Sequence, residues 1–162
     1  GLYRVKTDGS IENLRHNPMN TNSLCSNFVR SCCEDNSGDL WIGTFNGLNR
    51  YDRETGKFHL YTANGNSPDG LTHSSIWCIV KDGQGTIWLG DGWNIFRSAD
   101  GGRTFEEMKQ FGYAFMRDIL EDKEGNIWVA TMGNGVFRYQ PQTDETVNYL
   151  HIEGDSTSIG TN

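Results

Sequence analysis

The stretch DNSGDLWIG at residues 35–43 recurs twice in the chain, as DGQGTIWLG at 82–90 and as DKEGNIWVA at 122–130. Each copy places Asp first, Gly fourth and Trp seventh, and the tryptophans are 47 and 40 residues apart. Repeats of about 40 to 47 residues with four short strands each are typical of β-propeller blades. The repeated positions are Asp35, Gly38, Trp41, Asp82, Gly85, Trp88, Asp122, Gly125 and Trp128.

The repeated turn has a physical reason. An Asp at the first position accepts a hydrogen bond from the backbone two residues on, and the Gly three residues later supplies a positive φ. The Trp that follows is expected to lie between adjacent blades, where its ring buries a large area. A catalytic site is built once, whereas a scaffold part is built into every blade. We therefore interpret these repeated residues as structural.

A second signature follows each of these units, as GLNR at 47–50, NIFR at 94–97 and GVFR at 135–138, and the chain opens on GLYR at 1–4. Its arginines share one repeat position, so a structural hydrogen-bonding role is expected for Arg4, Arg50, Arg97 and Arg138. The chain begins and ends inside repeats, which predicts a segment of a longer protein. The predicted division is the second half of a blade plus a linker at 1–27, a blade at 28–74, a blade at 75–114, and a blade plus the next linker at 115–162.

Short runs rich in β-branched and aromatic residues predict four strands in each repeat. The first strand is expected at 29–34, 76–81 and 116–121, and the second at 40–44, 87–90 and 127–131. The third carries the arginine signature, and the fourth is expected at 57–62, 105–109 and 146–151. No segment has a convincing helical pattern. The predicted fold class is all-β, a partial β-propeller of about three and a half four-stranded blades.

The composition agrees with this fold and excludes several other classes. Glycine contributes 20 of the 162 residues and aromatic residues 12%, which suits short strands and tight turns better than helices. The formal net charge is −7 and no compact Lys/Arg cluster is present, so nucleic acid is not an expected partner. The sequence contains no apolar run of about 18 residues and no signal-peptide pattern.

Cysteine and histidine spacing predicts neither a metal site nor a cofactor site. No CxxC pair exists, and we expect free, mostly buried thiols at Cys25, Cys32, Cys33 and Cys78. The histidines are scattered without the spacing of metal ligands, at positions His16, His59, His73 and His151.

The repeated Asp-x-x-Gly-x-[Leu/Ile]-Trp unit, together with GLNRYDRETGKF at 47–58, resembles the two-component regulator propeller repeat. The resemblance covers essentially the whole chain. It implies the extracytoplasmic sensor region of a bacterial hybrid two-component histidine kinase, as found in polysaccharide-degrading bacteria. The parent would be an inner-membrane protein with this part in the periplasm. One repeat departs from the pattern, because the residues at 91–94 replace the usual Thr-x-x-Gly.

A second resemblance raises an enzyme alternative. The segment SADGGRTF at 98–105 is similar to the Asp-box of sialidases and other carbohydrate-active propellers. By register it fills the turn that residues 52–57 fill in the preceding blade, so we interpret its Asp and Gly as turn residues. The arginine triad and tyrosine nucleophile of a sialidase cannot be assembled, and no Gly-x-Ser-x-Gly elbow is present. We therefore expect no catalysis by this chain.

The candidate binding residues lie where the loops differ between repeats, since variable loops on a rigid scaffold usually carry recognition. Near one end of the first strands, equivalent positions hold Arg30, Trp77 and Arg117, and Trp93 stands in the unusual turn. Arginines can pair with a carboxylate or sulfate, and an aromatic ring can stack on a sugar. Alternatively, Trp77 packs between blades and the arginines pair with local acids. Tyr113 is a weaker candidate.

These observations predict a ligand-sensing segment that responds to a glycan-derived ligand and signals across the membrane to a kinase. One alternative is a set of purely structural blades that mediate protein contacts, with the ligand bound elsewhere. A less favoured alternative is part of an Asp-box carbohydrate-active enzyme. The expected partners are an oligosaccharide, the other blades of the same propeller and a second copy of the parent in a homodimer, with no nucleic acid.

Overall fold

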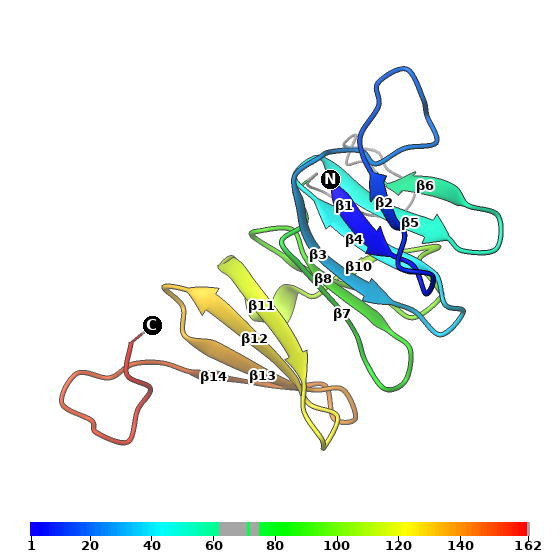
Figure 1. Cartoon of the computed structure of the whole chain (residues 1–162). Helices are drawn as coiled ribbons and strands as arrows, with labels where there is room; N and C mark the ends of the chain where they lie inside the picture. Colours follow the sequence, from blue (N-terminus) through cyan, green and yellow to red (C-terminus); the bar gives the residue numbers. More distant parts are fainter. Residues whose placement is uncertain (62–70, 72–74, 162) are drawn as a thin grey trace.

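The computed structural model describes residues 1–61, 71 and 75–161. The chain forms three four-stranded antiparallel sheets and one two-stranded sheet, arranged one after another as blades (Figure 1). Within these residues the helical structure is the short 3-10 element η1 (Lys109–Phe111). No helix in this part of the chain is long and apolar enough to cross a membrane. The predicted all-β partial propeller is confirmed.

The strands follow the order of the chain within each sheet. The half blade contains β1 (Leu2–Val5) and β2 (Ile11–Leu14). The first full blade contains β3 (Val29–Glu34), β4 (Leu40–Thr44), β5 (Gly47–Asp52) and β6 (Lys57–Tyr61). The second contains β7 (Cys78–Lys81), β8 (Ile87–Gly90), β9 (Ile95–Ser98) and β10 (Glu106–Glu107). The third contains β11 (Phe115–Glu121), β12 (Ile127–Met132), β13 (Val136–Gln140) and β14 (Glu145–Tyr149).

Two strands of the second blade are shorter than predicted. The strand predicted at 105–109 is reduced to β10, because the chain turns into η1 and buries the ring of Phe111 against the third blade. The strand predicted from residue 76 begins at Cys78, because the Ile76 N–H donates to the Thr44 carbonyl of the preceding blade at 2.9 Å. Thr62, His73 and most of the linker at 64–75 lie outside the described residues.

The first strands of the full blades lie next to one another, β3 beside β7 and β7 beside β11 (Figure 1). The fourth strands are therefore the outer edges of the blades, as in a propeller. The close packing requires glycine at the end of the second strand. A Cβ on Gly43 would lie 2.7 Å from the Ile76 side chain, and one on Gly90 would lie 3.0 Å from Met116 in the next blade.

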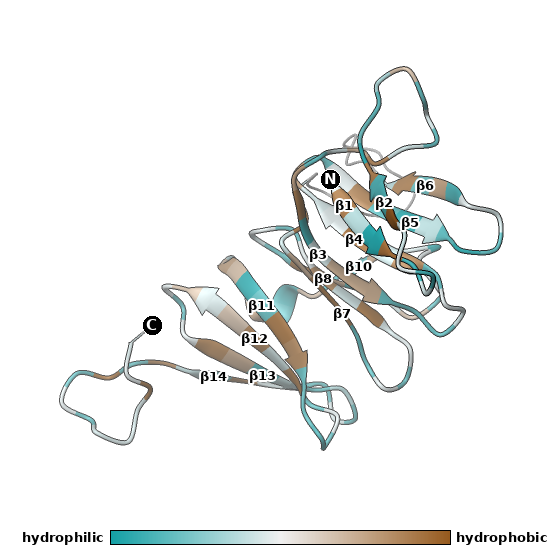
Figure 2. Ribbon diagram, viewed as in Figure 1, coloured by the Kyte–Doolittle hydropathy of each residue, from teal (hydrophilic) through white to brown (hydrophobic). Residues whose placement is uncertain are grey.

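The core lies between the blades, and the repeated tryptophans fill it. Figure 2 shows the hydrophobic residues gathered on the strands. Trp41 is wholly buried in a cluster with residues of the second blade, among them Ile79, Ile87, Leu89, Phe96 and Phe105. Trp88 is buried in the same way against the third blade, with Met116, Ile119, Ile127, Val129, Phe137 and Tyr139. Trp128 is only half-buried and stacks on Tyr149 of its own blade, because no further blade packs on it in the described residues.

An Asp–Trp hydrogen bond, which the sequence patterns did not predict, orients each of these tryptophans. In each blade the indole N–H donates to Oδ2 of the turn carboxylate. The distance from nitrogen to oxygen is 2.8 Å for Trp41 and Asp35, 2.9 Å in the second blade and 2.7 Å in the third. The Oδ1 atom accepts from the backbone N–H groups two and four residues on, as from Ser37 and Asp39 at 2.9 and 3.0 Å. The fourth residue of each turn has a positive φ, 87° at Gly38. The turn therefore positions the side chain that the next blade packs on.

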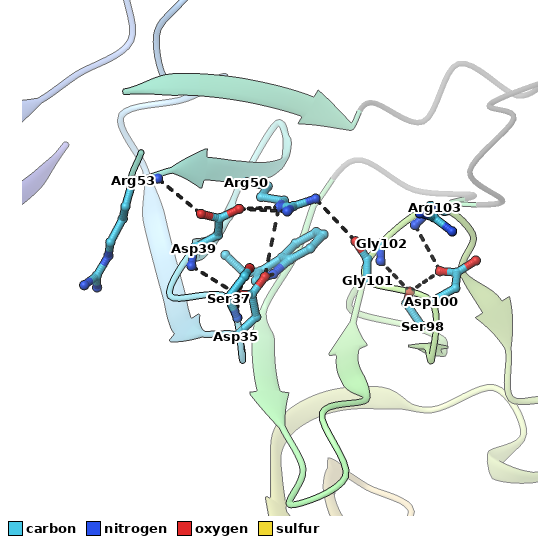
Figure 3. Close-up of polar contacts among 11 residues, drawn as sticks. Asp35, Ser37, Asp39, Arg50, Arg53, Ser98, Asp100, Gly101, Gly102 and Arg103 are labelled. Atoms are coloured by element: carbon cyan, nitrogen blue, oxygen red, sulfur yellow. Dashed lines mark hydrogen bonds and ion pairs between the residues drawn. The ribbon is translucent and has the colours of Figure 1, made fainter. Parts of the chain in front are cut away.

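Two of the repeated arginines, Arg50 and Arg97, connect consecutive blades, and Figure 3 shows the first of them. The Nη2 atom of Arg50 lies 2.7 Å from Oδ2 of Asp39, in its own blade. Its Nη1 atom donates to the Gly101 carbonyl of the next blade at 3.5 Å. Arg97 pairs with Glu106 at 2.9 Å and donates to the next blade at 3.4 Å, to the Tyr139 hydroxyl. These contacts are structural, and they place the arginine signature at the blade interfaces rather than at a binding site.

Candidate functional site

The four candidate residues lie at the end of the blades where the first strands begin, which we call the upper end. Arg30 is the second residue of β3, Trp77 directly precedes β7 and Arg117 is the third residue of β11. Trp93 is in the turn between β8 and β9. The structure connects these four side chains through one further ring, that of Phe115 at the start of β11.

The connected side chains form a chain of ring contacts across three blades. The Arg30 guanidinium lies 3.7 Å from the centroid of the Trp77 ring. Trp77 meets Phe115 edge to face at 4.9 Å, and Phe115 meets Trp93 at 5.3 Å. Trp93 stacks on Tyr113 at 4.9 Å, with an angle of 6° between the planes. The Arg117 guanidinium lies 5.6 Å from the Phe115 centroid. We call these six residues the aromatic cluster.

The unusual turn at 91–94 is what presents Trp93. The Asp91 carboxylate accepts hydrogen bonds from the N–H groups of Trp93 and Asn94 at 3.0 and 2.9 Å, which fixes the turn. Gly92 has a φ of 100°, and a Cβ there would lie 2.9 Å from Nε1 of Trp77. Only glycine gives both this backbone conformation and this space. The departure from the repeat pattern therefore brings Trp77 and Trp93 into one cluster.

The outer part of the cluster is accessible to a ligand. Trp93 is 40% exposed and Tyr113 is 66% exposed, whereas Trp77 and Phe115 are half-buried. Trp77 thus packs between blades, as the alternative interpretation had it. The same interpretation expected Arg30 and Arg117 to pair with local acids. Within the described residues, neither of them forms an ion pair with a carboxylate.

Phe115 and Gly92 were missed by the sequence analysis. A signal for Phe115 was present, because Tyr113, Phe115 and Arg117 alternate along the chain and alternate residues of a strand share one face. The strand was predicted to begin one residue later, which hid this alternation. Gly92 lies within the departure from the repeat pattern at 91–94, but its importance depends on the ring of Trp77, fifteen positions earlier in the chain.

The Asp-box segment is a turn that packs on the preceding blade. The Asp100 carboxylate accepts hydrogen bonds from the hydroxyls of Thr104 and Ser98 at 2.7 and 2.8 Å and from the N–H groups of Thr104 and Arg103 at 3.0 Å each. These bonds, that of the Thr104 hydroxyl first, lower the pKa of Asp100 to about 2. A Cβ on Gly102 would lie 2.0 Å from the Trp41 ring. The segment therefore serves the blade interface.

Two of the histidines have a structural role in the linkers. His16 Nδ1 lies 2.7 Å from the Leu24 carbonyl, and His151 Nδ1 makes the equivalent contact with the Ile159 carbonyl at 2.8 Å. The segment at 13–27 also borders a hollow of about 520 Å³, and five of its eleven lining residues are asparagines. Within the described residues, no group of three or more His, Cys, Asp or Glu side chains could hold a metal ion.

The cysteines are free, but their burial differs from the prediction of mostly buried thiols. Cys78 is buried, Cys25 and Cys33 are half-buried, and Cys32 is exposed. Cys32 and Cys33 are neighbours on β3, so their side chains point to opposite faces of the sheet. Burial raises the pKa of Cys33 and of Cys78 to about 12, which makes them poor nucleophiles.

Comparisons with known proteins agree with this architecture. A family model described as "Two component regulator propeller" matches residues 23–46, 70–93 and 110–133. A search of curated protein sequences finds no match. Two similar solved structures are extracellular domains of putative hybrid two-component systems from B. thetaiotaomicron. One is 20% identical with a TM-score of 0.81 and covers 100% of this chain and 21% of that one. The other is 22% identical with a TM-score of 0.72 and covers 90% and 20%.

A more distant likeness is to virginiamycin B lyase from Staphylococcus aureus, at 17% identity with a TM-score of 0.67, covering 96% of this chain and 50% of the lyase. At these identities the structural likenesses show a shared fold. The chain spans about a fifth of the length of the two sensor domains. Each matched segment ends one to three residues after the second strand of a blade, at 46 after β4, at 93 after β8 and at 133 after β12, so the match follows the blades of the structure. The chain therefore carries three repeats that match the two-component regulator propeller model.

Proposed function

We propose that the chain is a ligand-sensing part of the extracytoplasmic propeller of a two-component sensor histidine kinase, and that the aromatic cluster contacts a glycan-derived ligand. The observation that carries this proposal is the continuous series of contacts from Arg30 through Trp77, Phe115 and Trp93 to Tyr113. It joins three blades at the end where the loops differ between repeats. A ligand bound there would contact several blades at once.

The chemistry of the cluster favours a sugar. Rings that remain 40% and 66% exposed, at Trp93 and Tyr113, leave apolar area in water that a ligand can cover. A saccharide ring offers a flat C–H face for stacking and hydroxyls that guanidinium groups can bind. The rings are already positioned by stacking on each other and by the Gly92 turn, so little side-chain entropy is lost on binding.

The proposed location and signalling follow from the family. The similar B. thetaiotaomicron domains are extracellular, which supports a periplasmic location for this propeller. The parent protein would act as a homodimer, in which the bound ligand shifts the arrangement of the two ectodomains and so the activity of the kinase. We propose no catalytic role for this part of the chain, because Asp100 of the Asp-box is fully engaged in its turn.

The test is calorimetric titration of the complete ectodomain with a panel of neutral and acidic oligosaccharides. For any oligosaccharide that binds, Trp93→Ala is expected to weaken the affinity about tenfold, which corresponds to about 1.4 kcal/mol of lost stacking. Phe45→Ala is the matched control, because Phe45 is an exposed ring in the equivalent turn of the preceding blade and lies outside the cluster. Equal affinities for wild type and Trp93→Ala, or the absence of any binding, would refute the proposal.

A further inference from the structure

Arg30 and Arg117 differ from three arginines that form ion pairs within their own blades. Arg50 pairs with Asp39 at 2.7 Å, Arg53 with Glu34 at 2.6 Å and Arg97 with Glu106 at 2.9 Å. Arg30 and Arg117 are exposed and form no ion pair in the part of the chain that the structure describes. Their donor groups are therefore available to a ligand.

Both guanidinium groups are nevertheless held in place. Arg30 lies over the Trp77 ring at 3.7 Å, and Arg117 lies 5.6 Å from the Phe115 centroid with its Nη2 atom 3.4 Å from the Met132 sulfur. Stacking on a ring occupies the face of a guanidinium and leaves its edge, which carries the N–H donors, free to bind an anion in the same plane. This is the arrangement in which arginine binds a carboxylate with two parallel hydrogen bonds.

Two aspartates of the same region, Asp91 and Asp118, form no ion pair with these arginines in the part of the chain that the structure describes, although the chain has 21 acidic residues against 14 basic ones. Asp91 is buried in its turn, where its carboxylate accepts two backbone hydrogen bonds. Asp118 uses Oδ1 to accept the N–H of Ile119 at 3.0 Å. Two guanidinium groups that form no ion pair within the described residues thus belong to the aromatic cluster of an otherwise acidic protein.

We infer that the aromatic cluster selects an acidic saccharide, with Arg30 and Arg117 each able to bind a carboxylate or sulfate group and Trp93 and Tyr113 stacking on sugar rings. This inference rests on the proposed function and specifies its ligand class. An anionic group bound at either arginine gains charge-assisted hydrogen bonds that a neutral sugar cannot form. A neutral saccharide of the same length keeps only the stacking and the hydroxyl contacts.

The experiment compares matched pairs of probes on the complete ectodomain by calorimetry. One pair is trigalacturonic acid and its methyl ester, which separates a carboxylate from its neutral form. The other is a sulfated galactan tetrasaccharide and its desulfated form. We expect at least one acidic probe to bind about tenfold or more tightly than its neutral partner, with an affinity that falls as salt is added. The pair that shows this preference identifies the anion.

Arg30→Gln and Arg117→Gln are each expected to reduce this preference about tenfold and to leave binding of the neutral probe nearly unchanged. Arg103→Gln is the control, because it removes the same charge from an exposed side chain at the opposite end of the blade. Equal affinities for both members of each pair, with neutral probes still bound, would overturn the inference and leave the proposed function standing. Equal losses for acidic and neutral probes in the arginine variants would overturn it in the same way. If no probe binds, both proposals fail.

Discussion

Replacing Trp88 with Phe tests whether the Asp–Trp hydrogen bond and the packing between blades act together. Trp88 is 1% exposed, and its indole N–H donates to the Asp82 carboxylate at 2.9 Å. The change removes this donor and leaves a smaller ring in the cluster with the third blade. Trp128→Phe makes the same chemical change at the equivalent position of the third blade, where the indole is half-buried. The chain thus contains its own matched control.

The two variants are expected to differ clearly in cost. A lost hydrogen bond to a charged, buried acceptor costs about 1.5 to 3 kcal/mol. The smaller ring at Trp88 adds about 1 to 2 kcal/mol of lost packing. The free energy of unfolding is therefore expected to fall by about 2.5 to 5 kcal/mol in Trp88→Phe. Trp128→Phe is expected to cost roughly half of this or less, because water can replace the indole N–H and reach the site.

The assay is urea unfolding of the 162-residue chain, followed by far-UV circular dichroism at equal protein concentration. The midpoints and slopes of the wild type and of both variants are compared, since the slope reports the surface exposed on unfolding. Equal losses in the two variants, or a larger loss for Trp128→Phe, would show that burial between the blades does not set the strength of this contact.

Three further outcomes follow from the structure. Gly92→Ala places a Cβ 2.9 Å from Nε1 of Trp77 at a backbone φ of 100°. We expect the free energy of unfolding to fall by about 1 to 2 kcal/mol and the near-UV circular dichroism spectrum to change. An unchanged spectrum would contradict the close contact. The pKa of Asp100 is lowered from 3.8 to about 2, so its stabilising effect is complete above pH 4 and is lost as the pH falls toward 2. Thermal unfolding of Asp100→Asn should therefore depend less on pH between 4 and 2 than that of the wild type, and parallel curves would refute this. Iodoacetamide should modify the exposed Cys32 in the folded chain but spare Cys78, which is buried and has a pKa of about 12. Mass spectrometry that finds Cys78 modified first would contradict this burial.

The fold could be predicted from the sequence to a large extent because its determinants are local and repeated. The turn at Asp35 and Gly38 and the Trp41 that follows lie within seven residues, and the same spacing occurs three times. The short fourth strand of the second blade could not be predicted in this way. It ends early because Phe111 packs on Phe137, more than twenty residues further along the chain.

The candidate site could be predicted only in part. Arg30, Trp77 and Arg117 were found because they share a repeat position, and Trp93 because its turn breaks the pattern. That these side chains meet depends on how neighbouring blades pack, and no local pattern records this placement. Phe115, the ring that joins them, was therefore missed.

The hydrogen bond between each turn carboxylate and its tryptophan lies within one blade, although the tryptophan serves the contact with the blade that follows. A copied repeat therefore brings its own oriented interface residue, although the packing around that residue still depends on the following blade, as at Gly102 against Trp41. Gene duplication can lengthen such a protein one repeat at a time. The loops at the upper end take no part in this hydrogen bond, so they are free to diverge after each duplication. The divergent turn around Gly92 and Trp93 is what such a history would leave behind.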